Sequence, residues 1–184
     1  MENSYLTSAI KQFSYYKSLG DKTIGQLTYE DLKKEFAEDS NSVAIIVKHM
    51  VGNMLSRWTN FLTEDGEKEW RYRDDEFVDT LNSKDAIINS WEKGWNCLFN
   101  AIRPLSTSDL ERVIYIRNQG HTVTEAINRQ MMHYAYHTGQ IVFLGKIIKG
   151  KDWQSLSIPK GKSKAYNSEK FSKDRAKRHF TDDL

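Results

Sequence analysis

The chain has 184 residues, of which 28% are charged and 39% are hydrophobic, and its formal net charge is +2. Because single domains commonly hold about 100–200 residues, this length fits one domain with its own buried core. No apolar run approaches the roughly 18–20 residues that a membrane-spanning helix needs, so we expect a soluble protein with no membrane partner. A net charge so close to zero does not favour nucleic acid as a partner.

The charge is unevenly distributed along the chain. Residues 159–184 hold eight Lys/Arg and four Asp/Glu, a net +4, which leaves −2 for the remainder. We therefore predict a folded domain over residues 1–158 and a basic, partly flexible tail over residues 159–184. Cys97 is the only cysteine, and residues 1–4 lack the basic and apolar segments of a secretory signal, which together predict a cytoplasmic protein.

Apolar residues at three- and four-residue steps predict a first helix over residues 3–20. Gly20 is a candidate interruption, and the alternative is that Ile24 and Leu27 continue the same stripe. Thr28, followed by Asp31 at the third helical position, predicts the start of a short helix through Phe36. A second long helix follows a polar loop and reaches Phe61.

Residues 63–82 alternate in charge and predict a long connection, with Asp65-Gly66 as a turn. The third long helix begins near Ser83 and ends before Pro104. Cys97 lies about 120° from the centre of its apolar stripe, which predicts a partly exposed side chain without a chemical role.

Residues 113–116 have strand character and are followed by the turn signal Asn118-Gln119-Gly120, which predicts a short hairpin. Thr122 and Glu125 then form the capping pattern T-x-x-E, which opens a fourth long helix of about 27 residues ending at Gly150. Four long amphipathic helices with one long connection predict an all-α four-helix bundle.

Histidines stand on the inward faces of two of these helices. His133 and His137 are four residues apart, so they stack on one face of the fourth helix at about 3.6 residues per turn, with Cβ atoms roughly 5–6 Å apart. His49 lies in the apolar stripe of the second long helix, followed at one-turn steps by Asn53 and Arg57. Buried polar groups are costly unless they are paired or bind a ligand.

Three neutral imidazoles from two helices form a ligand set for a divalent metal and leave one coordination position open. Zinc fits this set, and nickel, iron or manganese fit as well. Each histidine taken singly is also compatible with a hydrogen-bonded core residue. Tyr134 stands where the H-E-x-x-H protease motif has glutamate, so no built-in general base accompanies the pair.

The chain resembles an uncharacterised bacterial branch of the DinB/YfiT-like superfamily of metal-binding four-helix bundles. The similarity covers most of residues 1–167. The segments that carry it are SVAIIVKHM (42–50), RWTNFL (57–62), DGEK (65–68), HTV (121–123), AINRQ (126–130), HYAYHTGQI (133–141) and SIPKGKS (157–163).

The resemblance implies one divalent metal ion, often zinc or nickel, bound by His49, His133 and His137. It also implies a tendency to form homodimers through the bundle. Characterised relatives include thiol S-transferases that use bacillithiol or mycothiol, and related metal-dependent isomerases.

Two classes of function stay open at this point. The first is a metal-dependent enzyme, either a transferase that adds a low-molecular-weight thiol to an electrophilic small molecule or a related hydrolase. In this reading Arg57 attracts a carboxylate of the thiol cofactor, while Asn53 or Gln140 orients the substrate or a histidine ring. The second is a non-catalytic metal-binding or stress-related interaction module.

Overall fold

The structure is a computed structural model that describes residues 4–38 and 40–182. The predicted helix start at residue 3 and the last two residues of the basic tail lie outside those ranges. The described chain is mostly helical with a short two-stranded antiparallel hairpin, as predicted. In chain order its elements are α1 (Ser4–Gln26), α2 (Tyr29–Leu32), α3 (Val43–Trp58), the 3-10 helix η1 (Asp74–Phe77), α4 (Lys84–Ile102), η2 (Thr107–Asp109), β1 (Val113–Ile116), β2 (Gln119–Thr122), α5 (Val123–Lys149), η3 (Gly150–Asp152) and α6 (Ser163–Phe171).

Hydroxyl side chains cap the N-termini of α3, α4 and α5. Ser42, Ser83 and Thr122 each accept a hydrogen bond from the backbone N–H three residues later, at 3.3, 3.0 and 3.1 Å. The Glu125 carboxylate in turn accepts from the Thr122 backbone N–H at 2.7 Å, which confirms the predicted capping box. Such caps stabilise a helix by about 1 kcal/mol each, so the helix starts follow from local chemistry.

Two predicted helix ends are wrong. The helix predicted through Phe36 stops at Leu32, after a single turn, although Thr28 and Asp31 cap it as expected. The second long helix stops at Trp58 rather than Phe61. Asn60 has a φ of 48°, a left-handed conformation that cannot continue a helix and that asparagine tolerates better than most residues.

The possible interruption of the first helix at Gly20 is also absent, because α1 continues through that glycine to Gln26. The glycine is instead a close contact with α4. A Cβ atom built on Gly20 would lie 2.3 Å from Cζ2 of Trp91, whose indole N–H donates to Asp21 at 2.6 Å. Gly20 therefore lets the indole of Trp91 pack directly against the backbone of α1.

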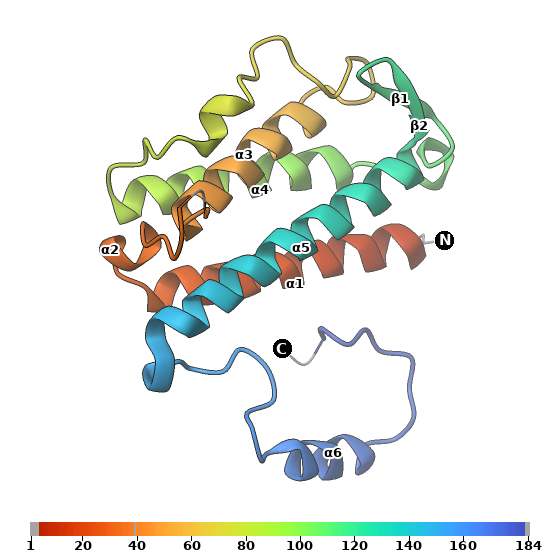
Figure 1. Cartoon of the computed structure of the whole chain (residues 1–184). Coiled ribbons are helices and arrows are strands. Elements are labelled where there is room, and N and C mark those ends of the chain that lie inside the picture. The colour runs from red at the N-terminus through yellow and green to blue at the C-terminus, as the bar shows by residue number, and fades with distance from the viewer. Residues whose placement is uncertain (1–3, 39, 183–184) are drawn as a thin grey trace.

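The four long helices of the described chain pack around a shared core. α3 packs on α4 and α1 on α5, and contacts between α3 and α5 and between α1 and α4 complete the arrangement (Figure 1). Phe13, Trp95 and Tyr134 bring rings from three helices together in this core, with centroids 5.8–6.4 Å apart. All three side chains are fully buried.

The connection between α3 and α4 is anchored on the hairpin. Backbone N–H groups of Arg117 and Asn118 both donate to the Asp65 carboxylate at 2.9 Å, and the Gly66 N–H donates to the Tyr115 carbonyl at 2.8 Å. Arg117 and Asn118 have φ values of 54° and 60°, as the two central residues of a tight hairpin turn require. The turn therefore comes one residue earlier than predicted, and the connection then runs back along α3 to η1 (Figure 1).

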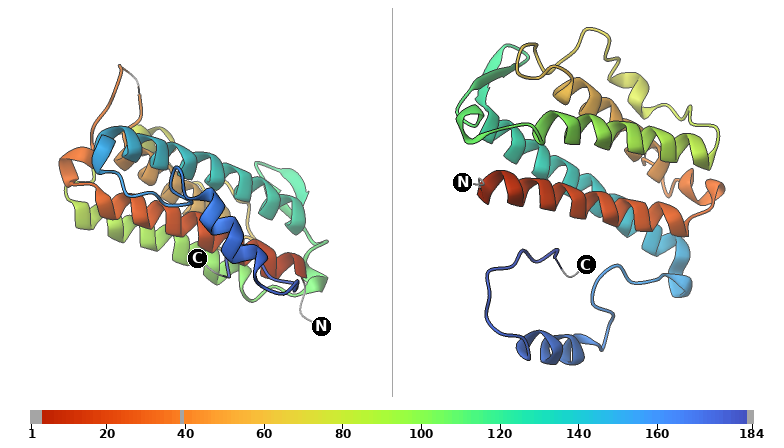
Figure 2. Two further views of the ribbon diagram at one scale, coloured as in Figure 1. Left: turned by 90° about the horizontal axis from the view of Figure 1, so that it is seen from below. Right: turned by 180° about the vertical axis from the view of Figure 1, so that it is seen from behind.

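The C-terminal segment after α5 lies beside α1, on the side away from α3 and α4 (Figures 1 and 2). Beyond α6 the chain returns to α1, where the Phe180 ring contacts the Tyr15 ring at 5.2 Å and Lys11 pairs with Asp182 at 2.5 Å. The domain boundary at residue 158 and the flexibility of the tail stay predictions. Within residues 4–38 and 40–182, no helix is both long and apolar enough to cross a membrane.

The contact between Gly20 and Trp91 gives a stability prediction. Gly20→Ala should destabilise the protein by about 1–3 kcal/mol, because the added methyl group must displace a buried indole. Gly25→Ala, in the same helix with no atom within 4 Å of the added Cβ, should leave stability unchanged or raise it by up to about 1 kcal/mol. Urea unfolding of both variants measures the difference. Equal stabilities would contradict the described packing of α1 on α4.

Candidate metal centre

Three imidazoles converge between α3 and α5. His49 comes from the middle of α3, and His133 and His137 come from successive turns of α5. The Nε2 atom of His133 lies 3.4 Å from Nε2 of His49 and 3.1 Å from Nε2 of His137. The structure thus brings together the three predicted ligands, with one nitrogen of each within 4.8 Å of the others.

These separations suit ligands of one ion. Two imidazole nitrogens that each bind the same zinc ion at about 2.0–2.1 Å lie about 2.8–3.4 Å apart for bond angles between octahedral and tetrahedral. The distances of 3.4 and 3.1 Å from His133 Nε2 to the other two Nε2 atoms fall within or at the edge of that range. The cluster is therefore close enough to hold a divalent metal ion.

Hydrogen bonds behind two of the rings determine which nitrogen carries the proton. The Nδ1–H of His49 donates to the Glu76 carboxylate at 2.9 Å, and the Nδ1–H of His137 donates to the side-chain carbonyl of Gln140 at 2.7 Å. The Gln140 amide is oriented for this role because its NH₂ group donates to the Tyr136 hydroxyl at 3.1 Å. Both Nε2 atoms consequently turn unprotonated lone pairs toward the centre of the cluster.

The third imidazole cannot satisfy both lone pairs. A proton on Nε2 of His133 can be donated to His49 or to His137, but not fully to both. A proton on its Nδ1 atom instead leaves three lone pairs facing one another, and that Nδ1 is buried without a hydrogen-bond partner among the described residues. A cation bound by all three Nε2 atoms removes the conflict, so the chemistry of the donor set fits a metal ion.

Burial keeps the histidines of α5 in the neutral form that binds metal. Burial, with smaller contributions from His137 and His49, lowers the pKa of His133 to about 3. Burial also lowers the pKa of His137 below its ordinary value, although its hydrogen bond to Gln140 works in the opposite direction. At neutral pH neither ring therefore needs to lose a proton before binding an ion.

Glu76 is a functional candidate that the sequence analysis missed. It lies in η1 on the long connection and is only 5% exposed. Arg71 donates to both of its carboxylate oxygens, at 2.7 and 3.0 Å. Burial opposes the charged form, but the hydrogen bonds from His49 and Arg71 hold the pKa of Glu76 below its usual range. The signal available in the sequence was a buried histidine that needs an acceptor, with an acidic run at residues 74–76 nearby in the connection.

Of the predicted cofactor- or substrate-binding residues, Gln140 contacts a histidine and the other two have partners elsewhere. The Tyr134 hydroxyl donates to the Asn53 side-chain oxygen at 3.0 Å, inside the core. Arg57 donates to the Gly66 carbonyl and, at 3.0 Å, to the Glu67 carboxylate. It therefore attaches the connection between α3 and α4 to α3. Direct contacts of these residues with a substrate or cofactor stay predictions.

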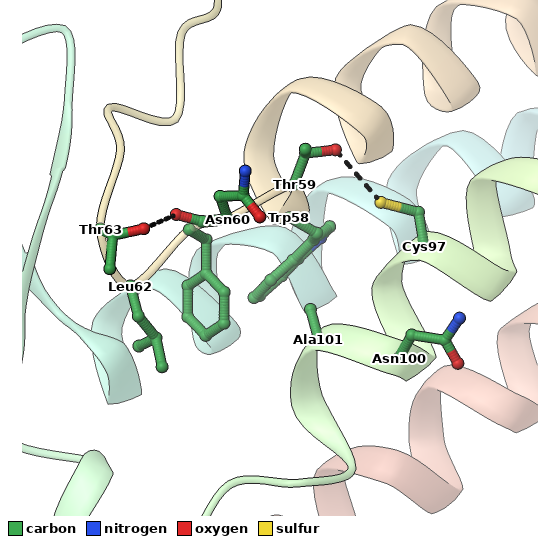
Figure 3. A pocket seen from close by; sticks show the side chains of 9 residues that line it. Trp58, Thr59, Asn60, Leu62, Thr63, Cys97, Asn100 and Ala101 are labelled. Carbon is green, nitrogen blue, oxygen red and sulfur yellow. Dashed lines mark hydrogen bonds between the residues drawn. The ribbon is translucent and has the colours of Figure 1, made fainter.

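Cys97 lines a different pocket. It is half-buried, as predicted, and its Sγ lies 3.6 Å from the Thr59 hydroxyl (Figure 3). The pocket of about 410 Å³ is formed by the end of α3, the turn after it and α4, and no histidine lines it. Two further histidines, His121 and His179, lie in β2 and in the C-terminal segment.

Fold and site together define a mostly helical protein with a candidate three-histidine metal centre. The chain belongs to the family described as "Protein of unknown function (DUF1572)", which matches residues 1–162 and so includes the four long helices and all three histidines. Comparisons with curated proteins and with solved structures found no match.

The histidine cluster predicts a metal content that changes with single substitutions. The purified protein should carry about one divalent ion per chain, and His133→Ala or His137→Ala should lose most of it, because two nitrogen ligands hold an ion far more weakly than three. His121→Ala is the matched control and should keep full metal content. Elemental analysis measures the stoichiometry, and circular dichroism checks that each variant is folded. Full metal content in both α5 variants would refute the site.

Proposed function

We propose that this protein is a divalent-metal-dependent enzyme of the DinB/YfiT-like type, built on a four-helix bundle. The observation that carries the proposal is the convergence of three Nε2 atoms from α3 and α5. The packing of α1, α3, α4 and α5 around one core supports the bundle. One histidine from the second long helix and two from the fourth also match the ligand arrangement of that superfamily.

We further propose zinc or nickel as the bound ion, with iron or manganese as alternatives. Three neutral nitrogen ligands suit all of these ions, and geometry and supply decide among them. Glu76 contacts Nδ1 of His49, on the edge of the ring that faces away from His133, so it does not compete for the remaining coordination position. This supports a centre with an open position, which is typical of catalytic rather than structural sites.

The proposed reaction is the transfer of a low-molecular-weight thiol, such as a bacillithiol-like compound, to an electrophilic small molecule. When bound, the ion supplies Lewis acidity that favours the anionic form of a thiol. The thiol would come from a small molecule, because the sequence has a single cysteine and Cys97 lies in the pocket beside Thr59. That single cysteine also supports a reducing cytoplasm as the compartment.

The residues of the chain have separate tasks in this proposal. Glu76 and Gln140 accept the Nδ1 protons of His49 and His137 and so orient the two rings. His133 and His137 are partly exposed, which leaves the centre accessible from the α5 side. The fully buried Tyr134 occupies the position where a metalloprotease has its glutamate base, so proton removal falls to the reactants or to solvent.

Two alternatives remain as proposals. A related hydrolase would use water in place of the thiol at the same centre. A non-catalytic metal-binding or stress-related interaction module would need the metal only for stability or assembly.

An assay with thiols distinguishes the enzyme from the module. Metal-loaded protein, supplied with low-molecular-weight thiols and an electrophilic acceptor, should form the conjugate. A chelator or His137→Ala should lower the rate at least about a hundredfold, because Lewis-acid stabilisation is worth several kcal/mol. Mass spectrometry measures the conjugate. If loaded protein turns over no thiol, ester or amide, the non-catalytic alternative is favoured.

We also propose that the protein forms a homodimer through α5. Four large apolar side chains of this helix are 47–73% exposed, and their spacings of four, seven and four residues place them on one helical face: Met132, Tyr136, Phe143 and Ile147. An exposed apolar stripe of this kind is typical of a protein–protein interface.

Light scattering after size exclusion tests the dimer. Phe143→Lys should raise the dimer dissociation constant at least about tenfold, since burying a phenylalanine side chain contributes about 1.5–3 kcal/mol. Phe171→Lys in α6 replaces an even more exposed phenylalanine outside the stripe and should have no effect. A wild-type protein that is monomeric at all concentrations would contradict the proposal.

A further inference from the structure

The contact between Glu76 and His49 is one of several that attach η1 to α3. On one side, the Lys48 ammonium group donates to the carbonyls of Asp75 and Val78, at 2.5 and 2.8 Å. On the other, the Phe77 ring stacks on the His49 ring with centroids 5.1 Å apart. Glu76 therefore contacts the Nδ1 edge of His49, and the next residue, Phe77, covers a face of the same ring.

Gly52 makes room for the Glu76 carboxylate. It lies three residues after His49, on the same face of α3. A Cβ atom added to Gly52 would lie 2.2 Å from Oε1 and 2.6 Å from Cδ of Glu76. No side chain larger than hydrogen fits at position 52 unless the carboxylate moves. The space beside Gly52, which we call the seat, therefore holds the Glu76 carboxylate that accepts the hydrogen bond from His49.

A chain of ion pairs continues from the buried Glu76 to the half-buried Glu67 in the connection. Arg71, whose side chain is 3% exposed, bridges Glu76 and Glu67, and Arg57 on α3 pairs with Glu67 as well. The Glu76 carboxylate is thereby fixed from two directions. It is held against His49 by contacts that involve both α3 and residues 67–76.

We propose that Glu76 is the positioning residue for the metal ligand His49, that Gly52 leaves the space that admits the Glu76 side chain, and that metal affinity therefore depends on the placement of the Glu76 carboxylate against His49. The inference rests on the metal site proposed above. A carboxylate behind a ligating imidazole fixes the tautomer and ring orientation and raises the basicity of the ligating nitrogen. Glu76 acts through His49 and does not itself bind the ion.

Metal affinity of a small set of variants tests the proposal. Glu76→Gln keeps the shape of the side chain but removes its charge, and Gly52→Ala fills the seat. Both should weaken the binding of Zn²⁺, measured by competition with a chelator, by about 10- to 100-fold. Both should also shift the visible absorption bands of the Co²⁺-loaded protein, which report on ligand geometry.

Two matched controls separate positioning from general destabilisation. Gly139→Ala adds the same methyl group to α5, two residues from His137, where no atom lies within 4 Å of the new Cβ. Glu67→Gln removes a carboxylate that pairs with the same Arg71 but has no histidine partner among the described residues. Both controls should bind Zn²⁺ within about twofold of wild type and keep the Co²⁺ spectrum. Urea unfolding of the metal-free proteins measures any loss of stability independently.

The outcomes are distinguishable. If wild type binds about one ion while Glu76→Gln and Gly52→Ala bind as tightly as Gly139→Ala, this inference is overturned and the metal site stands. Equal losses in Glu67→Gln and Glu76→Gln, in proportion to their losses of stability, would also overturn it, because the effect would then be structural. If wild type binds no ion, the proposed function fails together with the inference.

Discussion

The Tyr134 hydroxyl connects α5 to α3 inside the core, and the geometry of the histidine cluster depends on that connection. The hydroxyl donates to Asn53 at 3.0 Å and accepts from the Trp58 indole N–H at 3.1 Å, both on α3. A slip of one helix by a single turn, about 5.4 Å, would break both bonds and separate His49 from His133. Burial raises the pKa of Tyr134, so the hydroxyl stays a neutral donor and acceptor at any physiological pH.

Features determined by neighbours in the sequence could be predicted from it. The capping box of Thr122 and Glu125, the long amphipathic α5 and the hairpin before it all follow from residues within a few positions of one another. The pairing of His133 with His137 is local in the same way. Their meeting with His49 was also predictable, because an apolar stripe indicates which face of each helix turns inward.

Features determined by distant residues could not be predicted. Gly20 resembles a helix break until Trp91, seventy-one positions later, is seen to fill the space above it. Asn53 and Arg57 share a stripe with His49, yet neither contacts a histidine ligand in the described structure. Asn53 accepts a hydrogen bond from the Tyr134 hydroxyl, and Arg57 donates to Glu67 in the connection. Glu76 lies in a one-turn 3-10 helix within the long connection. The acidic run at residues 74–76 offered an acceptor for His49, but the local sequence did not indicate which carboxylate would reach it.

The seat at Gly52 makes two positions twenty-four residues apart depend on each other. The Glu76 carboxylate fits in its described place only if position 52 lacks a side chain, and the glycine there costs α3 about 1 kcal/mol of helix stability relative to alanine. Neither substitution alone is therefore neutral, and the two residues would be expected to change together. In this chain, the glycine and the carboxylate together point more specifically to the proposed metal centre than three histidines alone, which a buried polar core could also contain.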